Sequence, residues 1–72
     1  MTIWIYDSGA STEEIRRGID AAKAVFSEAG VTAQDAHTRH PEVWATAEAK
    51  ALDACCDGWL SIPESAHLEL EG

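Results

Sequence analysis

Positive charge is scarce in this sequence, because five lysines and arginines stand against thirteen aspartates and glutamates, giving a formal net charge of −8. A protein with this balance repels the phosphates of nucleic acids and the headgroups of anionic membranes. Basic surfaces attract it instead. We therefore expect a protein partner with a basic surface, and neither direct nucleic-acid binding nor membrane binding.

The negative charge is also uneven along the chain. Residues 1–39 hold six carboxylates and four basic side chains, a net of −2, whereas residues 40–72 hold seven carboxylates and one lysine, a net of −6. Two interpretations stay open: the acidity keeps a small protein in solution or suits high salt, or it marks a binding surface. The uneven distribution favours a binding surface.

Long apolar runs are missing too, and the first residues lack the basic and apolar regions of a signal peptide. We therefore expect a cytoplasmic protein. Cysteine occurs only as the adjacent pair Cys55 and Cys56. Such a pair cannot close the loops of a disulfide-stabilised secreted mini-protein, so no disulfide is expected.

Motifs of catalysis and metal binding are absent from the sequence: there is no G-x-S-x-G, no phosphate-binding glycine loop and no H-E-x-x-H. Adjacent cysteines on a helix point about 100° apart, unlike the C-x2-C pair of a zinc site. Cys56 is expected to point outward. His37 and His40 precede Pro41, where we expect a loop or a helix entrance. We therefore expect a non-enzymatic protein with no metal and no cofactor.

The length of 72 residues predicts one small domain, residues 1–72, with room for one thin core. Thr2–Tyr6 is rich in β-branched and aromatic residues and predicts a strand. Ser11 and Glu14 form an S-x-x-E capping box, which predicts a helix that ends at Gly30.

The middle of the chain predicts a second helix. Val31–Ala36 stays open between a brief strand and an extended connector. Pro41 suits the first position of a helix, which we expect to run to Gly58. Helical spacing places one stripe of residues in the core: Val43, Trp44, Ala47, Ala51, Ala54 and Cys55.

The last segment predicts a hairpin. Trp59–Ile62 and Ala66–Leu70 are expected to be strands, joined by the turn-prone tripeptide at 63–65. Alternation in the last strand points its leucines inward and its glutamates outward. The predicted fold is α+β, with two helices packed on one face of a small, mainly antiparallel three-stranded sheet.

Acidic side chains gather in the predicted second helix and the last strand. Glu42, Asp53 and Asp57 project within about 60° of one another on a helix, which predicts an acidic ridge. Glu69 and Glu71 share one face of the strand about 6.6 Å apart. With Glu64 on the preceding turn, these carboxylates are expected to line one end of the molecule and to imitate a run of phosphates.

Specificity needs more than charge, and two sets of apolar side chains offer it. Trp4 and Tyr6 lie on the strand face opposite Ile3 and Ile5, and aromatic residues are typical interface anchors. The second set lies on the predicted second helix, away from its core stripe: Ala45, Ala49 and Leu52. The alternative is structural, with the first strand buried on both faces and Trp59 packed at the base of the hairpin.

The whole-chain profile resembles the phage-encoded anti-CRISPR proteins, which are small, acidic, single-domain inhibitors without a catalytic motif. The acidic residues that support this resemblance are Glu42, Asp53, Asp57, Glu64, Glu69 and Glu71. The resemblance implies a DNA mimic that blocks a nucleic-acid-binding surface of a CRISPR effector complex, in the cytoplasm of the bacterial host if a phage encodes it. We expect a monomer. The alternative is a small protein-interaction or dimerisation module whose acidity serves only solubility.

Overall fold

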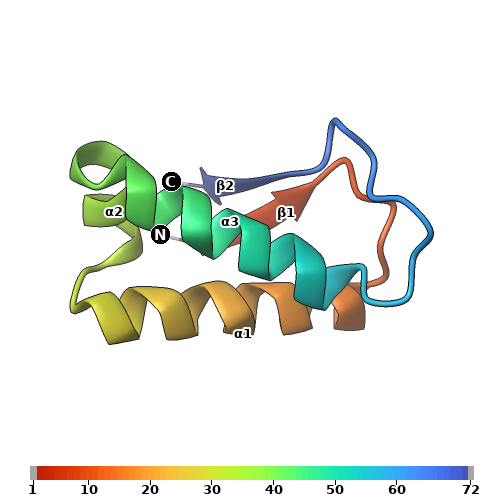
Figure 1. Ribbon diagram of the computed structural model, residues 1–72, viewed down its shortest axis with the longest axis horizontal. Coiled ribbons are helices and arrows are strands. Elements are labelled where there is room, and N and C mark those ends of the chain that lie inside the picture. The colour runs from red at the N-terminus through yellow and green to blue at the C-terminus, as the bar shows by residue number, and fades with distance from the viewer. Residues whose placement is uncertain (1, 72) are drawn as a thin grey trace.

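The computed structural model describes residues 2–71 and has three helices and two strands (Figure 1). In chain order the elements are β1 Thr2–Tyr6, α1 Thr12–Ala29, α2 Ala33–Arg39, α3 Pro41–Cys55 and β2 His67–Glu71. The long helices α1 and α3 lie side by side, and the two strands run along them on one side (Figure 1). The α+β class is confirmed, while the number of elements differs from the prediction.

The sheet has two antiparallel strands, the first and the last element of the chain, with Ile5 opposite Leu68 and Trp4 opposite Glu69. The predicted three-stranded sheet is wrong, because the segment at 59–62 does not form a strand. There the chain is still turning: the Trp59 N–H donates to the carbonyl of Cys56 at 3.0 Å. The outer edge of β2 meets a helix instead, since the Leu68 N–H donates to Glu48 Oε2 of α3 at 3.0 Å.

Helix α1 begins and ends where the sequence predicts. The Glu14 N–H donates to Ser11 Oγ at 3.3 Å, and the Ser11 N–H donates to Glu14 Oε1 at 3.0 Å, so the capping box is formed in both directions. Gly30 ends the helix in the left-handed conformation, with φ of 71°. A residue without Cβ adopts this conformation at little cost.

The segment after α1 is helical, although a strand or a connector was expected for Val31–Ala36. Thr32 begins α2 by accepting a hydrogen bond from the Asp35 N–H at 3.1 Å, a cap that the sequence analysis missed. The polar segment that includes His37 therefore lies in a helix and not in a loop. Pro41 opens α3 as predicted, but α3 ends at Cys55, and Gly58 lies in the turn that follows.

Small residues form the seam between α1 and α3. Ala22 of α1 and Ala47, Ala51 and Cys55 of α3 are fully buried. Of the predicted core stripe, Val43, Trp44 and Ala54 are only partly buried. The strands add the inner face of the sheet, and the buried core consists of Ile3, Ile5, Ala22, Phe26, Ala36, Ala47, Ala51, Cys55, Cys56 and Leu68.

Cys56 belongs to this core, with an exposed fraction of 3%, so the prediction that it points outward is wrong. The angle of 100° per residue holds only within a helix, and Cys56 is the residue that caps α3, with φ of −110° and ψ of 28°. The chain turns at this point, and the side chain joins the core cluster.

Candidate protein-binding surface

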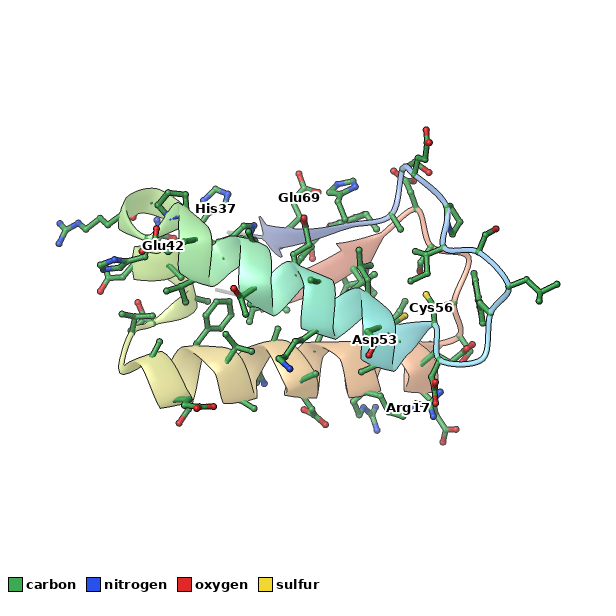
Figure 2. The ribbon with its side chains drawn as sticks, in the orientation of Figure 1. Arg17, His37, Glu42, Asp53, Cys56 and Glu69 are labelled. Carbon is green, nitrogen blue, oxygen red and sulfur yellow. The ribbon has the colours of Figure 1, made fainter. Side chains whose placement is uncertain are left out.

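The outer face of the two-stranded sheet carries aromatic and acidic side chains. Because side chains alternate along a strand, the residues that flank the buried Ile3, Ile5 and Leu68 lie on the outer face of the sheet. Trp4 also borders α1 there, beside Arg16 and Lys23. We call this surface the sheet face; it consists of Thr2, Trp4, Tyr6, His67, Glu69 and Glu71. Glu69 points away from α1 and α3 (Figure 2). The two glutamates are exposed, and Trp4, Tyr6 and His67 are half-buried.

Direct contacts hold the side chains of the sheet face in place. The rings of Tyr6 and His67 stack, with centroids 5.8 Å apart and planes 21° apart. The Tyr6 hydroxyl donates a hydrogen bond to Glu71. The His67 ring contacts the Ser65 carbonyl through Nδ1 at 2.8 Å and Glu69 Oε2 through Nε2 at 3.3 Å. These contacts connect the aromatic side chains of the sheet face to its glutamates.

These contacts change two pKa values. The Ser65 carbonyl, and then the carboxylate of Glu69, raise the pKa of His67 above its ordinary 6.5, because both favour N–H donors on the ring. The hydrogen bond to Glu71 raises the pKa of Tyr6 to about 12. Tyr6 therefore stays neutral near pH 7, and the charge of the sheet face depends on its carboxylates and on His67.

Lysine and arginine do not neutralise the carboxylates of the sheet face. Within residues 2–71, the ion pairs at 4.0 Å or less both involve His67, with Asp7 and Glu69 as its partners. Three of the five basic residues lie on α1: Arg16, Arg17 and Lys23. Arg16 and Lys23 border Trp4, but neither forms an ion pair with Glu69 or Glu71. Glu69 contacts His67 and Glu71 accepts from the Tyr6 hydroxyl, and both glutamates stay exposed to a cation from another molecule.

The other predicted acidic residues lie apart from the sheet face. Glu42 is at the start of α3 and Asp53 is near its end (Figure 2), and eleven residues of helix separate them by about 16.5 Å. Asp57 follows the end of α3, so helical spacing does not place it on the same ridge. Glu64 lies in the loop before β2. The structure brings Glu69 and Glu71 together, and it does not gather all six at one end.

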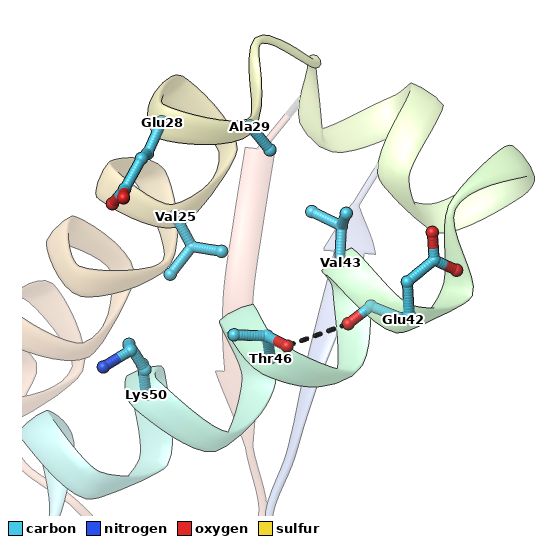
Figure 3. A pocket seen from close by; sticks show the side chains of 7 residues that line it. All are labelled: Val25, Glu28, Ala29, Glu42, Val43, Thr46 and Lys50. Carbon is cyan, nitrogen blue, oxygen red and sulfur yellow. Dashed lines mark hydrogen bonds between the residues drawn. The ribbon is translucent and has the colours of Figure 1, made fainter.

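Glu42 borders a groove between α1 and α3 instead (Figure 3). The groove encloses about 450 Å³, and Val25, Ala29 and Val43 form its apolar part. Its charged side chains are of both signs, since Glu28 and Glu42 occur together with Lys50. This groove therefore lacks the uniform negative charge that a phosphate mimic needs.

Apolar side chains are exposed on the loop between α3 and β2. Leu60 is fully exposed, and Trp59 and Ile62 are 37% and 39% exposed. Trp59 therefore does not pack at the base of a hairpin. Sequence reasoning missed this surface because it assigned the segment to a strand. On α3, Leu52 packs partly against the core, so it does not form the free apolar surface that was considered there.

The thiols and imidazoles do not form a site. In the part of the chain that the structure describes, no three His, Cys, Asp or Glu residues are arranged to hold a metal ion. Burial, with the adjacent Cys56, raises the pKa of the Cys55 thiol to about 11, so it is protonated at neutral pH. His37 packs edge-on against Trp44, with centroids 4.7 Å apart, and His40 makes no side-chain cap of α3.

The fold defines a small α+β protein, and comparison with known proteins adds no relative: no family model, no curated protein and no solved structure matches the chain. Among residues 2–71, no helix has the length and apolar character needed to cross a membrane. The surfaces of the molecule are therefore what indicates its function.

Proposed function

We propose that this chain is a non-enzymatic binding protein that uses the sheet face to occupy a basic surface of a partner protein. One observation carries the proposal: Glu69 and Glu71 are exposed beside two half-buried aromatic rings, and no lysine or arginine of residues 2–71 pairs with them. Carboxylates attract Lys and Arg side chains, and an indole or phenol ring adds contact area and cation–π attraction.

A nucleic-acid-binding groove is the kind of partner that suits this surface best. Such grooves are built from Lys and Arg to hold phosphates, and two carboxylates spaced along a strand present a comparable row of negative charge. The proposed activity is inhibition by occupancy, as a DNA mimic. A CRISPR effector complex is the particular target that the resemblance of the sequence suggests, and it is the narrower part of the proposal.

Binding to an oligolysine peptide tests the charged surface before the partner is known. The double variant Glu69→Gln/Glu71→Gln removes two charges from the sheet face and keeps the acceptor for Tyr6. Its matched control, Glu13→Gln/Glu28→Gln, removes two charges from exposed positions of α1. We expect the sheet-face variant to bind about tenfold more weakly at low salt and the control to lose much less. Equal losses in both variants would show that only net charge matters.

The narrower target needs a separate assay. Purified CRISPR effector complexes, mixed with the chain before target DNA is added, should lose DNA binding, and the Glu69→Gln/Glu71→Gln variant should inhibit less. Added salt should weaken the inhibition, because the contacts are between exposed charges. Unchanged DNA binding in effectors of every type would refute the CRISPR target and leave the oligolysine result standing.

The exposed loop favours a second candidate function, a protein-interaction module that uses apolar contacts. The side chain of Leu60 is fully exposed, so it adds nothing to the packing of the fold. Binding through this loop would persist at high salt and would be lost in a Leu60→Ser variant, whereas binding through the sheet face would show the opposite response to both changes.

A further inference from the structure

A groove between β1 and α1 has a volume of about 610 Å³, and its walls are mostly apolar. It lies near one end of the molecule, where β1 begins, α1 ends and α2 begins. It is lined by Thr2, Ile3, Ile19, Lys23, Phe26, Ser27, Val31 and Ala33. Its one ionisable lining residue is Lys23, so the groove combines apolar walls with a single positive charge.

The loop that carries Leu60 lies at the opposite end of the molecule, where α3 leads into β2 (Figure 1). Its apolar side chains are Trp59, Leu60 and Ile62, and we call this segment the apolar loop. Asp57 and Glu64 flank it on either side in the sequence. The apolar loop therefore has the features that complement the groove: apolar side chains between negative charges.

We propose that the groove of one chain receives the apolar loop of a second copy, in a two-fold symmetric dimer. Groove and loop occur at opposite ends of a molecule 32 Å long, so two copies placed side by side in opposite directions each bring a loop to the other's groove. A two-fold axis makes both contacts at once and closes the assembly. Lys23 of one copy then faces Asp57 or Glu64 of the other.

Charge favours the groove between β1 and α1, and not the groove shown in Figure 3, as the site that receives the apolar loop. The groove between α1 and α3 carries Glu28 and Glu42 against Lys50, a net negative charge that repels the acidic flanks of the loop. The groove next to β1 carries Lys23 without a carboxylate in its lining. The groove shares Thr2 with the sheet face, but Glu69 and Glu71 are not in its lining. A dimer therefore still presents two pairs of sheet-face glutamates, and this inference does not depend on the proposed function.

Sedimentation velocity over about 10 µM to 1 mM tests the dimer, since small interfaces give weak, concentration-dependent association. We expect the wild-type mass to rise from 7.8 kDa toward twice that value. Leu60→Ser should weaken association at least tenfold, and it should fold normally because Leu60 is fully exposed. Lys23→Glu should also weaken it, while the matched control Lys50→Glu should leave it within about twofold of wild type.

Three results would overturn the proposal. The first is a wild-type chain that stays at 7.8 kDa over the whole range, which would leave the groove to an occupant other than a second copy. The second is a Leu60→Ser variant that associates as tightly as wild type. The third is a Lys50→Glu variant that weakens association as much as Lys23→Glu does. That result would place the contact in the groove between α1 and α3.

Discussion

Gly18 is a buried residue of α1 that lies close to α3, and its replacement by alanine tests the seam between these helices. A Cβ added at this position would lie 2.6 Å from the carbonyl oxygen of Ala51 and 2.9 Å from the Cβ of Cys55. It would also collide with the Cδ1 of Ile5. A methyl group of Ile5 can rotate away, but a backbone carbonyl cannot, so α1 and α3 have to separate.

Two opposing effects decide how much the Gly18→Ala substitution changes the free energy of unfolding. Alanine in place of glycine inside a helix gains about 1 kcal/mol in helix propensity. Overpacking of a filled site costs about 1–3 kcal/mol, and the cost here belongs at the upper end because the contact is with backbone. The expected net loss is about 2 kcal/mol, out of a total stability of about 4–11 kcal/mol for a domain of this size.

Thermal and urea unfolding followed by circular dichroism measure the effect. A loss of about 2 kcal/mol lowers the Tm by about 8–16 °C in a small domain. The exposed Ala24→Gly substitution in the same helix is the control, with an expected loss of about 1 kcal/mol from propensity alone. A Gly18→Ala variant more stable than wild type would refute the close approach of α1 and α3.

Three further perturbations test the N-cap of α1, the contacts of His67 on the sheet face and the edge of β2. Ser11→Ala removes the N-cap of α1 and should cost about 1 kcal/mol in urea unfolding; no loss would contradict the capping box. Because the folded-state pKa of His67 is raised above 6.5, its contacts should stabilise the fold below about pH 6.5 and lose that effect as the pH rises through the folded value; an NMR midpoint below 6.5 would contradict this. Glu48→Ala should cost about 1–3 kcal/mol by leaving the Leu68 N–H without its acceptor, while Glu48→Gln should cost less; equal losses would argue against that hydrogen bond.

Local signals in the sequence predicted the first half of the fold well. The run Thr2–Tyr6 formed a strand, and the Ser11 and Glu14 pair formed the capping box, because both features depend on residues that are neighbours in the chain. Pro41 likewise marked the start of α3. Thr32 was an available signal for α2, since it occupies an N-cap position, but the short segment after it was read as extended.

The sheet could not be predicted from such local signals. The last strand was expected to pair with its neighbour in a hairpin, yet β2 pairs with β1, which lies more than sixty positions away in the chain. What decides between these arrangements is packing: the inner face of β1 needs Leu68 opposite Ile5, and the segment at 59–62 remains a loop. The error in the position of Cys56 has the same origin, since it came from extending α3 past its end.

Only part of the candidate site was predicted, because the sequence analysis had alternation within the last strand but not its pairing with β1. Alternation in a strand placed Glu69 and Glu71 on one face, and the structure adds Trp4 and Tyr6 to that same face through the pairing of β1 with β2. The ridge on α3 does not form as expected, because Asp57 lies beyond the end of the helix, where helical spacing no longer sets its direction. Helical spacing alone gives no account of where a helix stops.

The most direct test of the sheet face is an amide NMR titration of the chain with oligolysine at low salt. The proposal predicts that the largest shift changes fall on β1 and β2, at Trp4, Tyr6, His67, Glu69 and Glu71, and that they shrink as salt is added. Changes spread evenly over all exposed acidic residues, or concentrated at Glu42 and Asp53 on α3, would contradict it.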